Sequence, residues 1–173
     1  ADWQKRQGMA PLLRALGAAE GETRFVGGCV RDTLLGIDLS YIDLATRLEP
    51  ATVMERLKSA HIKTVPTGIA HGTVTAVLQG GAVEVTTLRR DVSTDGRRAT
   101  VAFTDDWHED AQRRDFTLNA LYAQRDGTIF DPTGHGVAHA KAGRITFVGD
   151  PEQRLTEDHL RNLRFFRFHA WFG

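Results

Sequence analysis

Two acidic residues on separate predicted strands are the best candidates for binding a catalytic metal ion. Asp43 lies on a short apolar strand at residues 42–45, and Glu84 alternates with apolar neighbours on a strand at residues 83–88. Carboxylates on one strand face can hold Mg²⁺ ions that bridge the attacking and leaving oxygens of a phosphoryl group. A solvent-facing role explains Glu84 about equally well. Tyr41, two residues before Asp43, shares its face but offers only a neutral phenol, a poor Mg²⁺ ligand.

A glycine pair, Gly27 and Gly28, separates a predicted strand end at residues 24–26 from a predicted helix at residues 29–35. Glycines let the backbone approach a ligand closely, and the helix beyond them offers unpaired N–H groups to a phosphate. Arg31 lies in the first turn of that helix and could neutralise phosphate charge. A tight turn with a solvated Arg31 is the simpler alternative. The pattern GxGxxG is absent. A dinucleotide-binding site, which is the commonest alternative interpretation of a strand, glycine turn and helix, is therefore excluded.

The segment at residues 110–121 is predicted to be a helix with charged and apolar residues on different sides. Its apolar residues would pack toward a core while Arg114 and Asp115 face a cleft. A charged face exposed to solvent explains the same pattern at least as well. The segment therefore points to a binding site only in combination with the other motifs.

A C-terminal helix is predicted from about Thr156 to residue 172, with Thr156 as its N-cap. An aspartate and an arginine three residues apart share one stripe of this helix, and two further arginines flank them. Such a pair presents acceptors and donors to the edge of a base, although an exposed ion pair of small value is the alternative. The residues concerned are Asp158, Arg161, Arg164 and Arg167.

The remaining predicted elements position these motifs. They are helices at residues 3–16 and 50–60, strands at residues 73–78, 83–88 and 128–130, and a hairpin turn at Gly80 and Gly81. Two stretches are predicted to lack packed elements: a polar, basic loop at residues 89–104, expected to be mobile, and a glycine-rich connection at residues 132–143.

Length and composition limit the class of protein. With 173 residues, one compact unit is expected, and the formal net charge of zero gives no overall signature of a nucleic-acid or membrane binder. Cys29 is the only cysteine, which excludes a disulfide framework and fits a reducing compartment. No apolar run is long enough to span a bilayer, and no signal peptide begins the chain. The expectation is a soluble, cytoplasmic protein with no membrane partner.

Seven ordered motifs together resemble those of the bacterial class II nucleotidyltransferases, which are the tRNA CCA-adding enzymes and the related poly(A) polymerases. The motifs are GGCVRDTLLG, IDLAT, EVTTLRRD, RRDFTLNAL, DPTGHG, GRITFVGDP and EDHLRNLRFFRF. The resemblance implies an α/β (α+β) fold, the polymerase-β-like nucleotidyltransferase head, with a small mixed sheet and flanking helices at residues 1–144. Residues 145–173 would begin a helical, nucleobase-binding neck, and the chain would be truncated before the domains that grip RNA.

The resemblance also implies roles for individual residues. Substrate would be bound by Gly27, Gly28 and Arg31 at the phosphates, by Arg114, Asp115 and Asn119 at the triphosphate and ribose, and by Asp158, Arg161, Arg164 and Arg167 at the base and nearby charges. Asp43 and Glu84 would hold Mg²⁺ and act in catalysis. Tyr41 stands where the family has its first metal aspartate.

The activity implied by the resemblance is template-independent RNA nucleotide transfer. CMP or AMP would pass from CTP or ATP to the 3′ end of an RNA, which the resemblance implies is a tRNA, with pyrophosphate leaving. Tyr41 is expected to remove most of the rate, on the order of a thousandfold or more. A catalytically silent nucleotide- or RNA-binding module is the alternative. Because CCA addition and poly(A) synthesis share these motifs, the product stays open.

Overall fold

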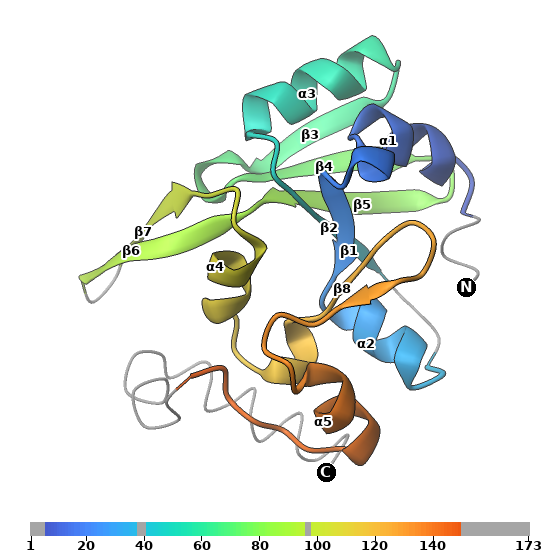
Figure 1. The fold of residues 1–173 in the computed structure, drawn as a ribbon. Helices are drawn as coiled ribbons and strands as arrows, with labels where there is room; N and C mark the ends of the chain where they lie inside the picture. The colour runs from blue at the N-terminus through green and yellow to red at the C-terminus, as the bar shows by residue number, and fades with distance from the viewer. Residues whose placement is uncertain (1–5, 38–40, 96–97, 150–173) are drawn as a thin grey trace.

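The computed structural model describes residues 6–37, 41–95 and 98–149. A seven-stranded sheet forms its centre, in the order β3-β4-β5-β2-β1-β8-β9 (Figure 1). Within it, β2 and β5 run parallel and the other described neighbours run antiparallel. The strands are β1 (Thr23–Val26), β2 (Ile42–Thr46), β3 (Lys63–Gly68), β4 (Thr73–Leu78), β5 (Gly81–Thr87), β8 (Tyr122–Ala123) and β9 (Ile129–Phe130). This mixed sheet with flanking helices confirms the predicted α/β (α+β) architecture.

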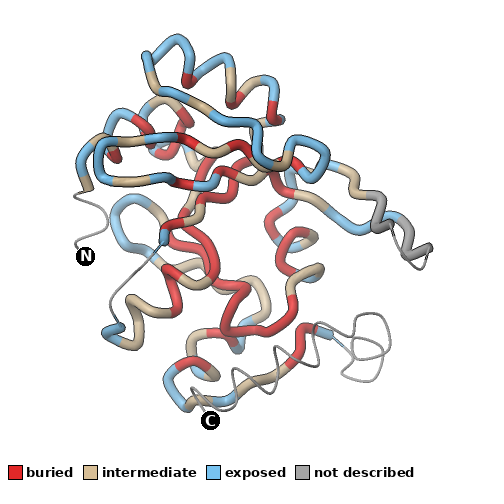
Figure 2. Tube along the Cα trace, turned by 180° about the vertical axis from the view of Figure 1, so that it is seen from behind, coloured by how far each residue is buried: buried red, intermediate tan, exposed pale blue. Residues whose placement is uncertain are grey.

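Three helices pack with the sheet around the larger hydrophobic core, and their burial follows helical spacing. They are α1 (Met9–Ala15), α2 (Gly28–Leu34) and α3 (Pro50–Ser59). In α3, Val53 and Leu57 are four residues apart and both buried, and Pro50 occupies the start of the helix, where its missing N–H is not needed. Buried chain concentrates where these helices meet the central strands (Figure 2).

The other face of the sheet is only partly covered. Helix α4 (Trp107–Gln112) packs there on a second cluster of buried residues, which comprises Val26, Ala45, Leu88, Trp107, Ala111, Ala120, Tyr122 and Val148. The carboxylate of Asp106 caps α4 by accepting a hydrogen bond from the His108 N–H at 2.8 Å. Helix α5 (Gly136–Ala142) and the short 3₁₀ helix η4 (Thr117–Asn119) form a third cluster below α4 (Figure 1).

The predicted strand, glycine turn and helix at the start of the site is present. Strand β1 ends at Val26, Gly27 adopts a φ of 73°, and α2 follows at once. The hairpin of β4 and β5 is also confirmed, with Gly81 at a φ of 126°. The helix predicted at residues 50–60 matches α3, and α1 is a shorter form of the helix predicted at residues 3–16.

The prediction of a mobile loop at residues 89–104 is wrong. Its residues form a separate two-stranded antiparallel hairpin, β6 (Arg89–Asp95) and β7 (Arg98–Phe103). Backbone hydrogen bonds build such a ladder whatever the side chains, and Val92, Val101 and Phe103 have high strand propensity. The charges of Arg90 and Asp91 are compatible with a hairpin because both side chains are exposed to solvent.

Two other elements differ from the expectation. The helix predicted at residues 110–121 stops after α4, because Phe116 is extended (φ −118°, ψ 149°) and pairs with Phe147 across an isolated bridge. The connection predicted at residues 132–143 contains α5, which ends at Gly143 with a φ of 65°. The helix predicted from Thr156 lies outside the described residues.

Candidate functional site

Asp43 and Glu84 are direct neighbours across the parallel pair β2 and β5. Their strand neighbours Ile42, Leu44 and Val83 are buried in the larger core on the opposite face of the sheet. Because side chains alternate, both carboxylates point away from that core and toward the partly covered face. The sequence prediction that they share one face is therefore confirmed. Asp43 is half-buried there and Glu84 is exposed.

The environment of Asp43 favours its neutral form in the absence of a cation. Burial is the largest cause that raises the pKa of Asp43, followed by the negative charge of Glu84, while Arg114 opposes them; the resulting pKa is about 6. Crowded carboxylate oxygens of this kind are donors that a hard divalent cation prefers. Among the described residues, no group of three His, Cys, Asp or Glu side chains could hold a metal ion.

Replacing Asp43 by asparagine is expected to stabilise the metal-free protein at neutral pH. A raised carboxyl pKa means that the folded state binds the proton more tightly, so stability falls as pH rises from about 4 to 6. The variant avoids this penalty, and its gain should reach about 1–3 kcal/mol at pH 7.5 and shrink toward zero at pH 4. Urea denaturation with a chelator at both pH values measures it.

A matched control for this measurement is Glu55→Gln, which changes an exposed carboxylate on α3. Its free energy of unfolding should equal that of the unmodified protein at both pH values. If Asp43→Asn does not increase the free energy of unfolding at pH 7.5, the raised pKa of Asp43 is wrong.

Tyr41 lies beside the glycine turn. A Cβ atom added to Gly28 would be 2.7 Å from the Tyr41 hydroxyl oxygen and 3.4 Å from Nη2 of Arg31, so only glycine fits there without displacement. The Tyr41 side chain is otherwise well exposed, with 51% of its surface accessible. The phenol therefore borders both the turn predicted to contact phosphate and the strand that carries Asp43.

Arg31 is buried and held by hydrogen bonds, which excludes the solvated alternative for this residue. Only 6% of its surface is exposed. Its Nε donates to Oδ1 of Asp32 at 2.7 Å, and its Nη1 donates to Oδ1 of Asn119 at 2.6 Å. The guanidinium is thus fixed at the base of the glycine turn by a residue 88 positions away.

Asn119 joins Arg31 to Asp115. Its Nδ2 donates to Oδ1 of Asp115 at 3.2 Å, and the same oxygen accepts the N–H of Phe116 at 2.8 Å. Asp115 is 7% exposed, so it is buried rather than facing an open cleft as predicted. The extended backbone at Phe116 leads into η4, which contacts α2 and carries Asn119. Three predicted substrate-binding residues thus form one hydrogen-bonded chain.

Arg114 belongs to a different network, centred on Asp110. Its Nη2 lies 3.0 Å from Oδ2 of Asp110, and its Nε donates to the Tyr122 hydroxyl at 3.3 Å. That hydroxyl donates to Oδ2 of Asp110 at 2.5 Å, and Nε of Arg113 donates to Oδ1 at 3.0 Å. Asp110 and Tyr122 therefore hold the Arg114 side chain in place, and its positive charge lowers the pKa of Asp43.

Asp110 is fully buried and strongly ionised. Burial alone would raise its pKa, but the charges of Arg114 and Arg113, with hydrogen bonds from Tyr122 and the Arg89 N–H, lower the pKa to about 2. Sequence reasoning missed both Asp110 and Tyr122. The spacing of Asp110 three and four residues before two arginines was the available signal, because such pairs meet on a helix.

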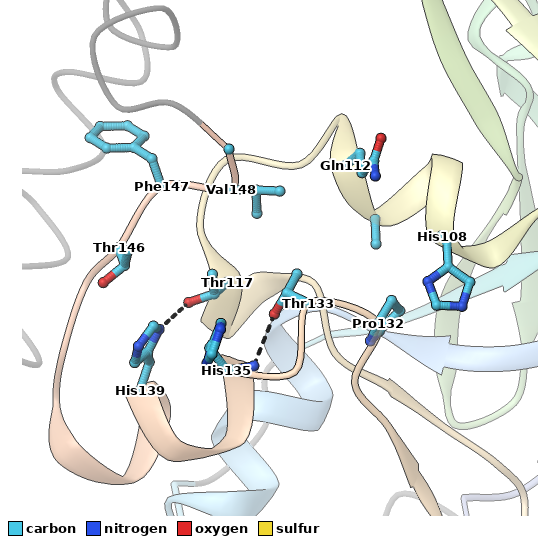
Figure 3. A pocket seen from close by; sticks show the side chains of 12 residues that line it. His108, Gln112, Thr117, Pro132, Thr133, His135, His139, Thr146, Phe147 and Val148 are labelled. Carbon is cyan, nitrogen blue, oxygen red and sulfur yellow. Dashed lines mark hydrogen bonds between the residues drawn. The ribbon is translucent and has the colours of Figure 1, made fainter.

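A separate pocket of about 680 Å³ lies between α4 and α5 (Figure 3). The rings of His135 and His139 stack at 5.6 Å, and Nδ1 of His139 lies 2.7 Å from the Thr117 hydroxyl. None of Asp43, Glu84 or Arg31 lines it. The pocket is therefore not the site that the sequence predicts.

The proposed base-reading residues cannot be placed in this arrangement. Asp158, Arg161, Arg164 and Arg167 lie outside the described residues, as does most of the segment at 145–173 assigned to a second domain. Residues 145–149 are described, and they pack against the head through Phe147, whose ring is 5.1 Å from that of Phe116. No helix in the described part is long and apolar enough to cross a bilayer.

Comparisons with known proteins agree on one group of relatives. Residues 23–146 match the model of the poly A polymerase head domain. The mouse protein "CCA tRNA nucleotidyltransferase 1, mitochondrial" is 44% identical over 165 residues, which are 95% of this chain and 38% of the mouse protein. A "CCA-adding enzyme" of Latilactobacillus sakei is 43% identical, over 94% of this chain and 40% of its own length. This chain thus spans about two fifths of each relative.

Solved structures give the same result. The CCA-adding enzyme of Bacillus stearothermophilus in complex with CTP has a TM-score of 0.77 and 39% identity, covering 90% of this chain and 37% of that protein. A tRNA nucleotidyltransferase complexed with a primer tRNA and an incoming ATP analogue has a TM-score of 0.67 and 26% identity, over 89% of this chain and 43% of its own.

Proposed function

This chain belongs to the poly(A) polymerase head-domain family, and we propose that it is the catalytic head of a CCA-adding nucleotidyltransferase. The reaction moves CMP or AMP from CTP or ATP to the 3′ end of a tRNA, with release of pyrophosphate. The family and the polymerase-β-like head fold inferred from the motifs are confirmed by the family match and the CTP-bound relative. The observation that carries the proposed activity is the register of Asp43 and Glu84 beside a fixed Arg31.

The names of the relatives favour CCA addition over poly(A) synthesis. Both the mouse and the Latilactobacillus sakei relatives are CCA-type enzymes, and the solved relatives contain CTP or an ATP analogue. CTP, ATP and the tRNA 3′ end are therefore the proposed partners of this chain. Cytoplasmic residence is a further part of the proposal, supported by the single, buried Cys29 and the absence of cysteine pairs.

Asp43 and Glu84 are the proposed ligands of Mg²⁺ and fit that role as neighbouring hard-oxygen donors. When bound, the ion would neutralise charge on the transferred phosphoryl group and its leaving oxygens. Binding and orientation of the nucleotide would depend on the chain's own residues. Arg31 and the glycine turn would neutralise and orient the triphosphate, and Asn119 with Asp115 would hold Arg31 in position for this. Arg114 helps to keep Asp43 ionised, since its positive charge lowers the pKa of that carboxyl.

Base selection belongs to the second part of the proposal. Asp158 and Arg161 would read the incoming base, with Arg164 and Arg167 supplying positive charge nearby. The head would end near residue 144 and the helical neck would follow. These assignments rest on the family motifs, in which the aspartate and arginine offer an acceptor and donors to the base edge.

A catalytically silent nucleotide- or RNA-binding module is the second candidate function. The specific observation in its favour is Tyr41, which stands where the family has a metal-binding aspartate. Within the described residues, the site therefore has only the carboxylates of Asp43 and Glu84. The phosphate-binding residues Gly28 and Arg31 and the Asp115–Asn119 pair are retained in this reading. Transfer would then be absent while nucleotide binding persists.

Both candidates predict that the 173-residue chain binds CTP and ATP. In calorimetric titrations with Mg²⁺, binding is expected at up to millimolar concentration, and Arg31→Met should weaken it by about tenfold or more, because a charge-assisted hydrogen bond to phosphate is worth about 1.5–3 kcal/mol. Arg14→Met, on the exposed side of α1, is the control and should bind normally. Absence of binding by the unmodified chain would rule out both functions.

A further inference from the structure

Another pocket lies at the opposite end of α4 from Arg114. It has a volume of about 550 Å³, and two arginines and two aromatic residues form much of its wall: Arg24, Arg47, Trp107 and Phe130. Arg24 pairs with Ala45, two residues beyond Asp43 on β2, so it projects from the same face of the sheet. None of Asp43, Glu84 or Arg31 lines this pocket. It is therefore separate from the proposed nucleotide site.

The two arginines converge on one indole. The guanidinium carbon of Arg24 is 4.4 Å from the centroid of the Trp107 ring and 4.7 Å from that of Phe130. The guanidinium carbon of Arg47 is 5.8 Å from the Trp107 centroid, and its Nε donates to the Asp105 carbonyl at 3.0 Å. Cation–π contacts hold both groups in place. Burial, and then the charge of Arg47, lower the pKa of Arg24, so the two cations repel each other.

Hydrogen-bond donors are in surplus around this pocket. Within the described residues, Nε and Nη1 of Arg24 and Nε1 of Trp107 are buried without a hydrogen-bond partner. All three are donors, and a buried donor that is left unsatisfied destabilises the fold. A ligand with several acceptor oxygens would satisfy these donors once the two side chains shift to expose them.

Two aspartates share the pocket wall with the arginines. Asp105 and Asp106 also line the pocket, but the Asp106 carboxylate caps α4 through the His108 N–H. In the described part of the chain, neither Arg24 nor Arg47 has an ion pair with a carboxylate within 4.0 Å. Two arginines that form no ion pair within the described residues therefore meet at one open pocket.

We propose that this pocket binds a phosphate group, either a phosphodiester of an RNA backbone or a free phosphate or pyrophosphate ion. Guanidinium groups match phosphate because their donors form parallel charge-assisted hydrogen bonds to two oxygens. Arg47 is exposed and would reach the ligand first, while Arg24 and Trp107 line the pocket beside it. The proposal rests on this pocket alone and does not require the nucleotidyltransferase activity.

The indole N–H of Trp107 provides a direct reporter in NMR spectra of the 173-residue chain. Its resonance, assigned with a Trp107→Phe variant, is followed during separate titrations with inorganic phosphate, pyrophosphate and a short single-stranded RNA at matched ionic strength. A saturable shift is expected, and Arg47→Met should weaken the apparent affinity by about tenfold. Arg31→Met, at the nucleotide site, should leave the titration unchanged. Thermal unfolding confirms that each variant is folded.

The titrations also distinguish the sources of phosphate. Saturation by RNA at much lower concentration than by inorganic phosphate or pyrophosphate identifies an RNA-backbone site, whereas saturation by the small anions at equal or lower concentration identifies a free-anion site. The proposal is overturned if the Trp107 resonance gives no saturable shift with any of the three probes. It is equally overturned if Arg47→Met binds them as tightly as the unmodified chain.

Discussion

Tyr41→Asp is expected to raise the rate of nucleotide transfer on the order of a thousandfold or more. Tyr41 is two residues before Asp43 and well exposed, so a shorter acidic side chain meets no buried neighbour that it must displace. A carboxylate there would add a charged oxygen to those of Asp43 and Glu84, where the phenol supplies none at neutral pH. Removal of its hydroxyl from Gly28 would also open the space above the glycine turn.

The rate is best measured in a chimera that joins this chain to the C-terminal region of the Latilactobacillus sakei relative, since the chain spans 40% of that protein. Transfer of CMP and AMP to a tRNA lacking its terminal nucleotides is compared between Tyr41 and Tyr41→Asp forms. Tyr41→Phe is the matched control, and it should remain as slow as the Tyr41 form because neither ring supplies a carboxylate. Full activity in the Tyr41 form would disprove the role given to this position.

Asp110→Asn is expected to destabilise the folded chain by about 3–5 kcal/mol, the typical loss when one partner of a buried ion pair is removed. Asp110 is 0% exposed, and its two oxygens accept from Arg113, Arg114, Tyr122 and the Arg89 N–H. The amide of asparagine would turn one acceptor into a donor facing these donors. The half-buried Arg113 and Arg114 would then lose the negative charge of Asp110.

Urea denaturation at pH 7 tests this, with Glu109→Gln as a control on the same helix. Glu109 forms an exposed pair with Arg90 at 3.8 Å and accepts a hydrogen bond from the Thr104 hydroxyl at 3.2 Å, which glutamine can also accept, so the change should cost less than about 1 kcal/mol. The pKa of Asp110 is lowered to about 2, so its stabilisation is present above pH 4 and is lost as pH falls toward 2. Equal stability of the two variants at pH 7 would contradict the network described for Asp110.

Local patterns in the sequence predicted the parts of the site that depend on neighbouring residues. The glycine pair predicted the turn before α2, because few other residues adopt a φ of 73° as Gly27 does. Alternation of apolar residues predicted that Asp43 and Glu84 face away from the core. These features are set by spacing within a single strand or turn.

Features that depend on distant contacts were not predictable in the same way. The hydrogen bond from Arg31 to Asn119 joins residues 88 positions apart, and no local pattern encodes it. The break between α4 and η4 depends on the pairing of Phe116 with Phe147, which overrides the helical spacing of the segment. Tertiary contacts also make Asp110 a buried organiser of Arg114, where the sequence suggested only a charged helix.

The most direct test of the central claim is nucleotide transfer by the Tyr41→Asp chimera with and without a second change, Asp43→Asn. CTP and ATP are supplied separately with Mg²⁺ and a tRNA lacking its terminal nucleotides, and the extended products are separated by length. Nucleotide addition by the single variant and its loss in the double variant are predicted, because Asp43 would be an essential ligand. Equal addition by both variants would show that the Asp43 and Glu84 face of the sheet is not the catalytic site.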